Sequence, residues 1–220
     1  MVSIRNYEGN MENALREIVS SADFILEGGA GHDTTPLVWL RERGYTGPYV
    51  RMDNEIYPVQ LTEGEYGSQN IRGDFLDFRI ARELIDRFRS KHPAFLTKLA
   101  LEPAIVRSNH LNYGGSIETI PATVESAVKT FSVYNVQLHM APALFEFASD
   151  EYVRKSGKDP KSWSELCDNL RILDTGIFDV DVGKLLLYRT FKEFLETSED
   201  HGWKIFLLTD QSDVLFMKKS

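Results

Sequence analysis

The chain has 220 residues, of which 42% are hydrophobic, and a formal net charge of −8 at pH 7. This length allows one large domain or two small ones, and the charge argues against nucleic-acid binding driven by bulk charge. The single cysteine, Cys167, excludes an internal disulfide, and no apolar run is long enough to span a membrane. Because the polar N-terminal segment also lacks a secretory signal, we expect a soluble cytoplasmic protein.

Helical and strand patterns alternate in the first part of the chain. Apolar residues recur at helical spacing in several segments, and short apolar runs of strand length lie between them. Gly44 and Pro93 are suited to end two of the helices. The expected elements are helices at 10–21, 35–43, 56–62 and 79–92, and strands at 23–27, 49–52 and 70–75.

The second part of the chain begins with a segment that is hard to assign. Residues 94–130 hold an apolar stretch, two adjacent glycines and a possible helix at 122–129, which is too long for a simple connection. We therefore expect an insertion, or lid, at 94–130 that could cover a site. The elements expected after it are strands at 131–140, 170–178, 204–208 and 214–217, and helices at 142–152 and 185–203.

This order of elements predicts an α/β fold. Strands that alternate with helices form a mostly parallel sheet with helices on both faces. The last two strands are close enough to form a hairpin, so the final strand should run antiparallel to its neighbour. We predict a single domain over residues 1–220 with a seven-stranded sheet and an insertion after the third strand. Ligands of such sheets bind at the carboxyl ends of the strands.

A glycine-rich turn follows the first of these strands and carries the main functional signal. Glu27 ends the strand, and Gly28, Gly29 and Gly31 follow it. Glycine has no Cβ, so the backbone can adopt positive φ and approach a ligand closely. A helix that starts directly after such a turn offers N–H groups to a polar or anionic ligand. The simpler interpretation is a turn that only joins a strand to a helix.

Asp53 strengthens the functional interpretation of the turn. The second strand ends at this acid, which completes a strand, glycine turn, helix, strand and acid of the length found in nucleoside-binding βαβ units. A carboxylate at this position can accept hydrogen bonds from both hydroxyls of a ribose. The alternative is an acid that only ends a strand.

These residues together resemble the class I S-adenosylmethionine-dependent methyltransferases, which have a Rossmann-like fold. Glu27-x-Gly29-x-Gly31 is similar to the first motif of that family, and Asp53 matches its ribose-binding acid. Gly73-Asp74-Phe75 resembles the third motif, which meets the adenine. Residues 136–140 resemble the exit of the fourth strand, and residues 188–218 resemble the C-terminal helix and hairpin. The chain departs from the family at Asp33, which replaces the third glycine.

The resemblance implies an S-adenosylmethionine site and two candidate catalytic residues. His139 could act as a general base because its ordinary pKa is near neutrality, although a lone histidine is more often structural. Asn135 could face the cofactor or only satisfy backbone groups at a strand end. The five histidines show no metal-ligand spacing, so no metal site is predicted. The implied cofactor-binding residues are Glu27, Gly28, Gly29, Ala30, Gly31, Asp53, Asn54, Asp74, Phe75 and Asn135.

The function that follows from the resemblance is methyl transfer from S-adenosylmethionine to a small molecule or, second, a protein. Such a reaction depends on alignment of donor and acceptor and often needs no strong base. The altered glycine motif and the middle insertion favour an alternative, a non-catalytic binding or regulatory protein of the same fold. A nicotinamide-dependent oxidoreductase ranks lower because Thr34 stands where its third glycine would be.

Overall fold

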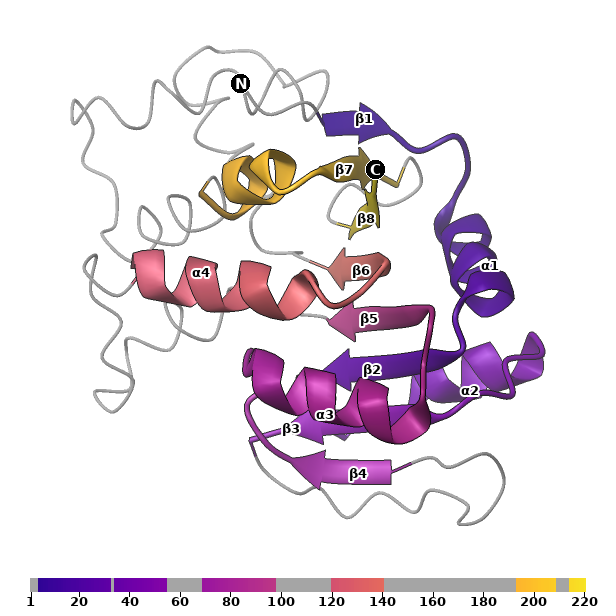
Figure 1. The fold of residues 1–220 in the computed structure, drawn as a ribbon. Helices are drawn as coiled ribbons and strands as arrows, with labels where there is room; N and C mark the ends of the chain where they lie inside the picture. The colour runs from indigo at the N-terminus through magenta and orange to yellow at the C-terminus, as the bar shows by residue number, and fades with distance from the viewer. Residues whose placement is uncertain (1–3, 33, 55–68, 98–119, 141–192, 209–213) are drawn as a thin grey trace, which may run out of the picture.

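In the computed structural model, strands from the first and the last described segments belong to one sheet (Figure 1). The structure describes residues 4–32, 34–54, 69–97, 120–140, 193–208 and 214–220. Eight strands form this sheet in the order β1-β7-β8-β6-β5-β2-β3-β4. The strands are β1 (Ile4–Asn6), β2 (Phe24–Gly28), β3 (Tyr49–Asp53), β4 (Gln69–Arg72), β5 (Pro93–Thr97), β6 (Val136–Met140), β7 (Trp203–Leu207) and β8 (Val214–Lys219).

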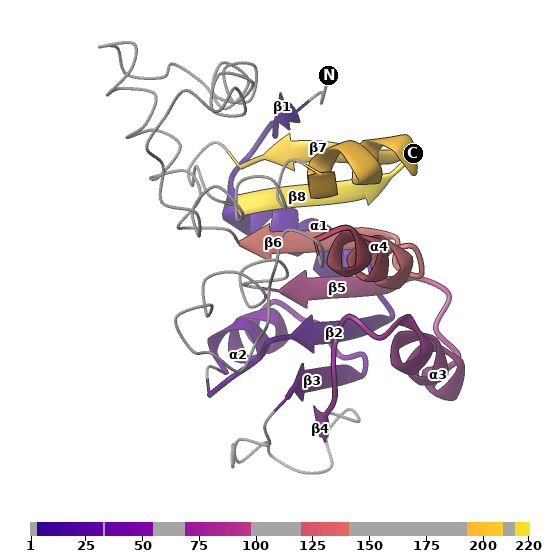
Figure 2. The same cartoon turned by 90° about the vertical axis from the view of Figure 1, so that its left-hand side faces the viewer.

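Helices cover both faces of the sheet. One face carries α1 (Met11–Ser21) and α2 (Thr35–Glu42), and the other carries α3 (Phe78–Phe88), α4 (Ile120–Phe131) and a helical segment at 193–200. Figure 2 shows α3 and α4 on one side of the sheet and α2 on the other. None of the helices in the described ranges is long and apolar enough to cross a membrane.

The starts of three helices follow from local sequence. The side chain of Asn10 caps α1 by accepting from the Asn13 N–H, and Asp77 caps α3 by accepting from the Arg79 N–H. Pro36 lies in the first turn of α2, where its missing N–H costs nothing.

The central strands are buried on both faces, as parallel strands between two helical layers must be. All five residues of β2 and all five of β5 are buried. Successive side chains of β2 enter opposite cores, with Phe24 and Leu26 on the α3/α4 side and Ile25 on the α1/α2 side. Phe95 of β5 pairs in register with Leu26 and belongs to the same α3/α4 core.

The order of strands reverses at β2. From β2 the chain proceeds to β3 and β4 on one side, and then returns to place β5 and β6 on the other side. All these neighbours are parallel, whereas β8 lies antiparallel between β6 and β7. The predicted mostly parallel sheet with an antiparallel last strand is therefore confirmed.

The predicted number of strands, seven, is wrong. The described residues contain eight strands. Six of them were predicted, and the other two, β1 and β5, are absent from the sequence-based prediction. The short β1 has no apolar run and exists through its pairing with β7, Ile4 to Ile205 and Asn6 to Leu207. The predictions at 56–62, 142–152 and 170–178 fall outside the described residues.

The expected insertion at 94–130 needs correction at both ends. Residues 94–97 belong to β5, which pairs with β2 and β6 in the middle of the sheet, and α4 begins at Ile120. In the sequence the apolar pattern continues past Thr97, which hides the end of this strand. Residues 98–119, to which an insertion would be reduced, lie outside the described residues.

The strand predicted at 131–140 is also shorter than expected. Phe131 ends α4, and the Tyr134 N–H donates to the Phe131 carbonyl in the turn that follows. The strand β6 therefore starts at Val136, after this turn rather than before it.

Because β5 is a central strand, removal of the Phe95 ring should destabilise the protein as strongly as removal of other large core side chains. Phe95 is fully buried, and its ring lies 5.2 Å from that of Phe131 and 5.1 Å from that of Tyr134. We expect Phe95→Ala to lower the free energy of unfolding by about 3–5 kcal/mol in urea denaturation. The control is Phe78→Ala, since that ring is 36% exposed and its loss should cost far less. Equal losses in the two variants would contradict the assignment.

Candidate functional site

The strand order reverses between β2 and β5, whose carboxyl ends lie at the same edge of the sheet. Ligands of open α/β sheets bind at this topological switch point. The segment that leaves β2 there is the glycine turn, residues 29–31, in which Gly29 has φ 66° and Gly31 has φ 54°. Both values lie in the left-handed region that glycine adopts without strain. The sequence therefore predicts the position of this turn correctly.

The N–H groups of the glycine turn are bonded to β3. The N–H groups of Gly29 and Ala30 donate to the Met52 carbonyl at 2.9 and 3.3 Å, and the Gly31 N–H donates to Asp53 Oδ2 at 3.0 Å. These three hydrogen bonds fasten the turn to the end of β3.

Asp53 lies next to the glycine turn, as the βαβ unit predicts. It is the last residue of β3, half-buried, and its carboxylate reaches Gly31 across the edge of the sheet. Asn54, the next residue, is exposed, and its carbonyl accepts from Arg72 Nε at 2.9 Å. The structure therefore brings Asp53 to the glycine turn, whereas Asn54 is bonded to Arg72 of β4.

Glu27 has protein partners that the sequence did not reveal. Its Oε2 accepts from Arg51 Nε and from the Tyr49 hydroxyl, both at 3.0 Å, on the α1/α2 side of the sheet. We call Glu27, Tyr49 and Arg51 the buried polar cluster, since each is at most 3% exposed. Burial first, and then Glu27, raise the pKa of the Tyr49 hydroxyl well above its ordinary value, so this group stays protonated and donates.

Arg51 is the residue of this region that sequence reasoning missed. It stands in a strand whose other residues are buried and apolar up to Asp53, opposite Glu27 in the parallel register. A charge in such a strand must be paired when it is buried. The pairing of Glu27 with Arg51 could have been inferred from the neighbouring positions of two opposite charges in adjacent buried strands.

Phe75 covers the start of the glycine turn. A Cβ at Gly28 would lie 2.7 Å from Cγ of Phe75, and one at Gly29 would lie 3.6 Å from its Cε1. Asp74 is exposed, and its Oδ1 accepts from the Leu76 N–H at 2.9 Å, which stabilises the turn before α3. The structure thus places Phe75 against the glycine turn, while Asp74 has the turn-stabilising contact of the simpler interpretation.

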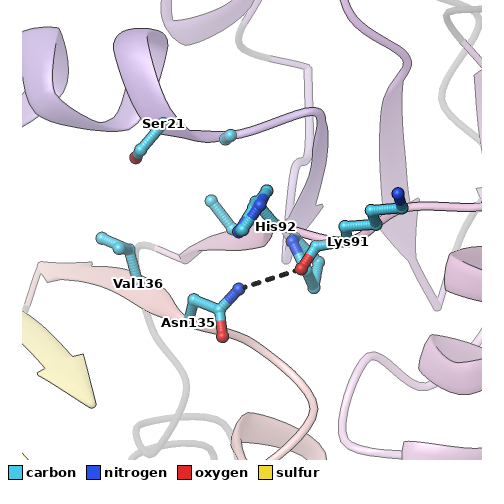
Figure 3. Close-up of a pocket in the computed structure, with 8 residues that line it drawn as sticks. Ser21, Lys91, His92, Asn135 and Val136 are labelled. Carbon is cyan, nitrogen blue, oxygen red and sulfur yellow. Dashed lines mark hydrogen bonds between the residues drawn. The ribbon is translucent and has the colours of Figure 1, made fainter. Parts of the chain in front are cut away.

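Asn135 does not belong to this group of residues. It precedes β6 and accordingly lies at the amino end of the parallel strands, the edge opposite the glycine turn. Its N–H donates to the Pro93 carbonyl, and its side-chain amide donates to the Lys91 carbonyl at 3.4 Å (Figure 3). The prediction of a cofactor-facing or catalytic Asn135 is corrected, because the strand begins after this residue instead of before it.

Asn135 instead lines a pocket of about 250 Å³ at that opposite edge, beneath the end of α1. Figure 3 shows Ser21 at the end of α1 above His92, Asn135 and Val136, with the Lys91 side chain extending away from them. The lining residues are Ser21, Ala22, Lys91, His92, Pro93, Ala94, Asn135 and Val136.

His139 is a core residue. Its ring packs against the rings of Phe131, Phe95 and Phe194 at centroid distances of 4.8, 6.0 and 5.6 Å. Its Nε2 lies 2.7 Å from Oε1 of Gln137, whose amide in turn donates to the Phe131 carbonyl. Burial lowers the pKa of His139 from 6.5 to about 3, so the ring is neutral and enclosed near pH 7. This environment fits the structural alternative and not a general base.

No group of three or more His, Cys, Asp or Glu residues suited to hold a metal ion occurs within the ranges that the structure describes. Fold and site together define an α/β protein with a candidate ligand site at the switch point of a mostly parallel sheet.

Comparison with known proteins gives a distant likeness to methyltransferases. One solved structure is the MycE methyltransferase of the mycinamycin biosynthetic pathway, in complex with Mg, SAH and mycinamycin VI, at 10% identity and TM-score 0.42. The match covers 95% of this chain but only 44% of that one. Another is an S-adenosylmethionine-dependent methyltransferase of Anabaena variabilis, at 8% identity and TM-score 0.40, covering 100% of this chain and 99% of the other.

No protein-family model and no curated protein sequence matches the chain. With both TM-scores below 0.5, neither structural likeness identifies the family or the function.

Contact between Phe75 and the glycine turn can be tested with a double-mutant cycle. The methyl group added by Gly28→Ala would overlap Phe75, and we expect a loss of about 1–3 kcal/mol from this overpacking. In the Gly28→Ala/Phe75→Ala variant the overlap with the ring is gone and only the contact with the Phe75 Cβ, at 2.9 Å, remains, so the two single losses should fail to add by at least about 0.5 kcal/mol. Urea denaturation of the parent, the two single variants and the double variant measures the coupling. Strictly additive losses of stability would show that Phe75 does not contact the turn.

Burial of His139 predicts how stability depends on pH. Its folded-state pKa, about 3, lies below the unfolded value of 6.5, so the unfolded chain binds the additional proton as the pH falls below 6.5. This contribution to stability is complete above pH 6.5 and should fall by about 2 kcal/mol between pH 7 and pH 5. The variant His139→Gln lacks this term. Its urea-denaturation midpoint should therefore depend less on pH than that of the parent, and equal dependence would mean that His139 is solvated.

Proposed function

We propose that this chain binds S-adenosylmethionine at the glycine turn and transfers its methyl group to an acceptor, with a small molecule favoured over a protein. The observation that carries the proposal is the contact of Asp53 with Gly31 at the switch point of the sheet. This contact joins a carboxylate to a positive-φ glycine turn at the edge where such sheets bind ligands.

The residues present fit a nucleoside. No residue in the described ranges lies within 4 Å of the position that a Cβ would take at Gly31. A carboxylate has two oxygens with about four acceptor positions. Asp53 can therefore retain the Gly31 N–H and still accept from ribose hydroxyls, which are donors that a carboxylate binds strongly.

Phe75 is the proposed apolar neighbour of the adenine. It is half-buried, and it already packs on Gly28 at the entrance of the same turn. Aromatic side chains offer a flat, polarisable surface of the size of a base. We assign a weaker role to Asp74, since its carboxylate stabilises a backbone turn. Gly28, Gly29, Ala30 and Asn54 are proposed to contribute backbone surface.

When bound, S-adenosylmethionine supplies an electrophilic methyl group on a sulfonium. The protein's own contribution is to bind the nucleoside, to orient it through the glycine turn, and to hold the acceptor in line. We propose no proton transfer to His139, because the ring is enclosed among Phe131, Phe95 and Phe194.

A non-catalytic binding protein is the second candidate. The observation in its favour is that the N–H groups of Gly29, Ala30 and Gly31 already donate to β3. A site closed in this way could retain a nucleoside without presenting an acceptor. Transfer of a labelled methyl group from S-adenosylmethionine to any component of a cell extract would exclude this candidate.

The test of the first proposal is calorimetric titration of the parent chain and two Asp53 variants with S-adenosylhomocysteine. The parent should bind, and Asp53→Ala should weaken binding by about 30-fold to several hundred-fold, because charged hydrogen bonds contribute roughly 1.5–3 kcal/mol each. Asp53→Asn keeps an oxygen for the Gly31 N–H and should lose less. No heat from the parent at millimolar ligand, or parental affinity in Asp53→Ala, would overturn the proposal.

A further inference from the structure

We propose that Arg51 is the positioning residue of the glycine turn, and that Glu27 acts through Arg51 instead of contacting a ligand. The proposal rests on the proposed function, because the turn is taken to be part of the nucleoside site. The side chain of Arg51 forms hydrogen bonds both with a neighbouring strand of the sheet and with the glycine turn.

Arg51 connects Glu27 of β2 with the glycine turn through three hydrogen bonds. Its Nε donates to Glu27 Oε2 at 3.0 Å, and its Nη2 donates to the Ala30 carbonyl at 3.0 Å and to the Gly31 carbonyl at 3.3 Å. The side chain is 2% exposed, so these bonds form away from solvent. The guanidinium therefore fixes the two last carbonyls of the turn on the α1/α2 side of the sheet.

Arg51 and Asp53 hold the same residue from two directions. They are two positions apart on β3, so their side chains leave the strand on the same face. Asp53 accepts the Gly31 N–H while Arg51 donates to the Gly31 carbonyl. Both polar groups of Gly31, at φ 54°, are thus set by side chains of one strand. The shape of the turn depends on β3 as much as on its own glycines.

Glu27 completes the arrangement by neutralising Arg51. A buried guanidinium without a counter-charge would be strongly unfavourable, and Glu27 Oε2 meets both Arg51 and the Tyr49 hydroxyl. Replacing a buried ion pair with apolar groups is often neutral or stabilising, so net stability alone does not account for it. Positioning of the turn gives the ion pair a role that an apolar pair could not have.

Lysine could not take the place of Arg51. The contacts to Glu27, Ala30 and Gly31 use the planar, forked donors of a guanidinium, whereas an ammonium is a compact charge with one nitrogen. Arg51→Lys can keep the ion pair with Glu27 but should release the two carbonyls of the turn.

The experiment compares three variants of the full chain by thermal melting and by calorimetric titration with S-adenosylhomocysteine. Arg51→Lys removes the contacts to the turn. Glu27→Met/Arg51→Met replaces the ion pair with apolar side chains of similar length, and it should melt somewhat below the parent because the buried Tyr49 hydroxyl loses its acceptor. We expect both to bind S-adenosylhomocysteine at least about tenfold more weakly, since the turn loses its fixed shape. A double variant that binds S-adenosylhomocysteine as tightly as the parent would show that the ion pair does not position the turn, and it would overturn the proposal.

Arg41→Lys is the matched control. Arg41 Nη1 donates to the Tyr45 and Gly47 carbonyls, both at 2.8 Å, which is the same pair of backbone contacts before the amino end of β3. This variant can lose stability, but it should bind S-adenosylhomocysteine as the parent does. An equal loss of affinity in Arg41→Lys and Arg51→Lys would overturn the proposal.

Amide hydrogen exchange provides a readout that needs no ligand. The N–H groups of Gly29, Ala30 and Gly31 should exchange faster in Arg51→Lys and at the parental rate in Arg41→Lys. If the parent does not bind S-adenosylhomocysteine, the proposed function fails, while this pattern of exchange still supports positioning by Arg51. Parental exchange of all three groups in Arg51→Lys would overturn positioning whatever the parent binds.

Discussion

The position of β2 constrains the rest of the structure. This strand pairs with β3 on one side and β5 on the other, and helices cover both of its faces. Every side chain of β2 is therefore enclosed, and a charged residue can be accommodated there only with a partner. Because strands are added in opposite directions from β2, the chain that leaves this strand starts at the topological switch point of the sheet.

The buried polar cluster is the exception to an otherwise apolar interior around β2 and β3. Glu27, Tyr49 and Arg51 occupy one face of these strands, and the residues between them fill the opposite core. Hydrophobic contacts specify the layers of the fold but tolerate small shifts, whereas hydrogen bonds between buried charges require particular distances and angles. The sheet thus combines a tolerant core with a polar contact that permits a single arrangement of the turn beside it.

Local signals were sufficient for the elements near the site. The apolar run of β2, the positive-φ glycines and the cap at Gly44 each act over a few residues, so the turn and its nearness to Asp53 could be predicted. Elements and burial that depend on residues far apart in the sequence could not be predicted. The short β1 is formed by its pairing with β7, and the burial of His139 depends on Phe194, far along the chain.

Errors of boundary had larger effects than errors of type. Beginning a strand at Phe131 instead of Val136 moved Asn135 from one edge of the sheet to the other. The unbroken apolar pattern after Pro93 concealed the central strand β5. The contact of Glu27 with Arg51, 24 positions away, can be inferred only once the two buried strands that carry them are placed side by side.

The antiparallel strand β8 has a consequence for how this protein is made. It lies inside the sheet, between β6 and β7, although residues 214–219 follow every other strand of the sheet in the sequence. Until they emerge from the ribosome, β6 presents an unpaired edge, and neither β7 nor β1 has a neighbour that connects it to the remaining sheet. Exposed strand edges invite pairing with other chains, and contacts between residues so far apart in sequence form slowly. The nascent chain therefore passes through a stage in which the glycine turn can be complete while half of the sheet still awaits its closing strand.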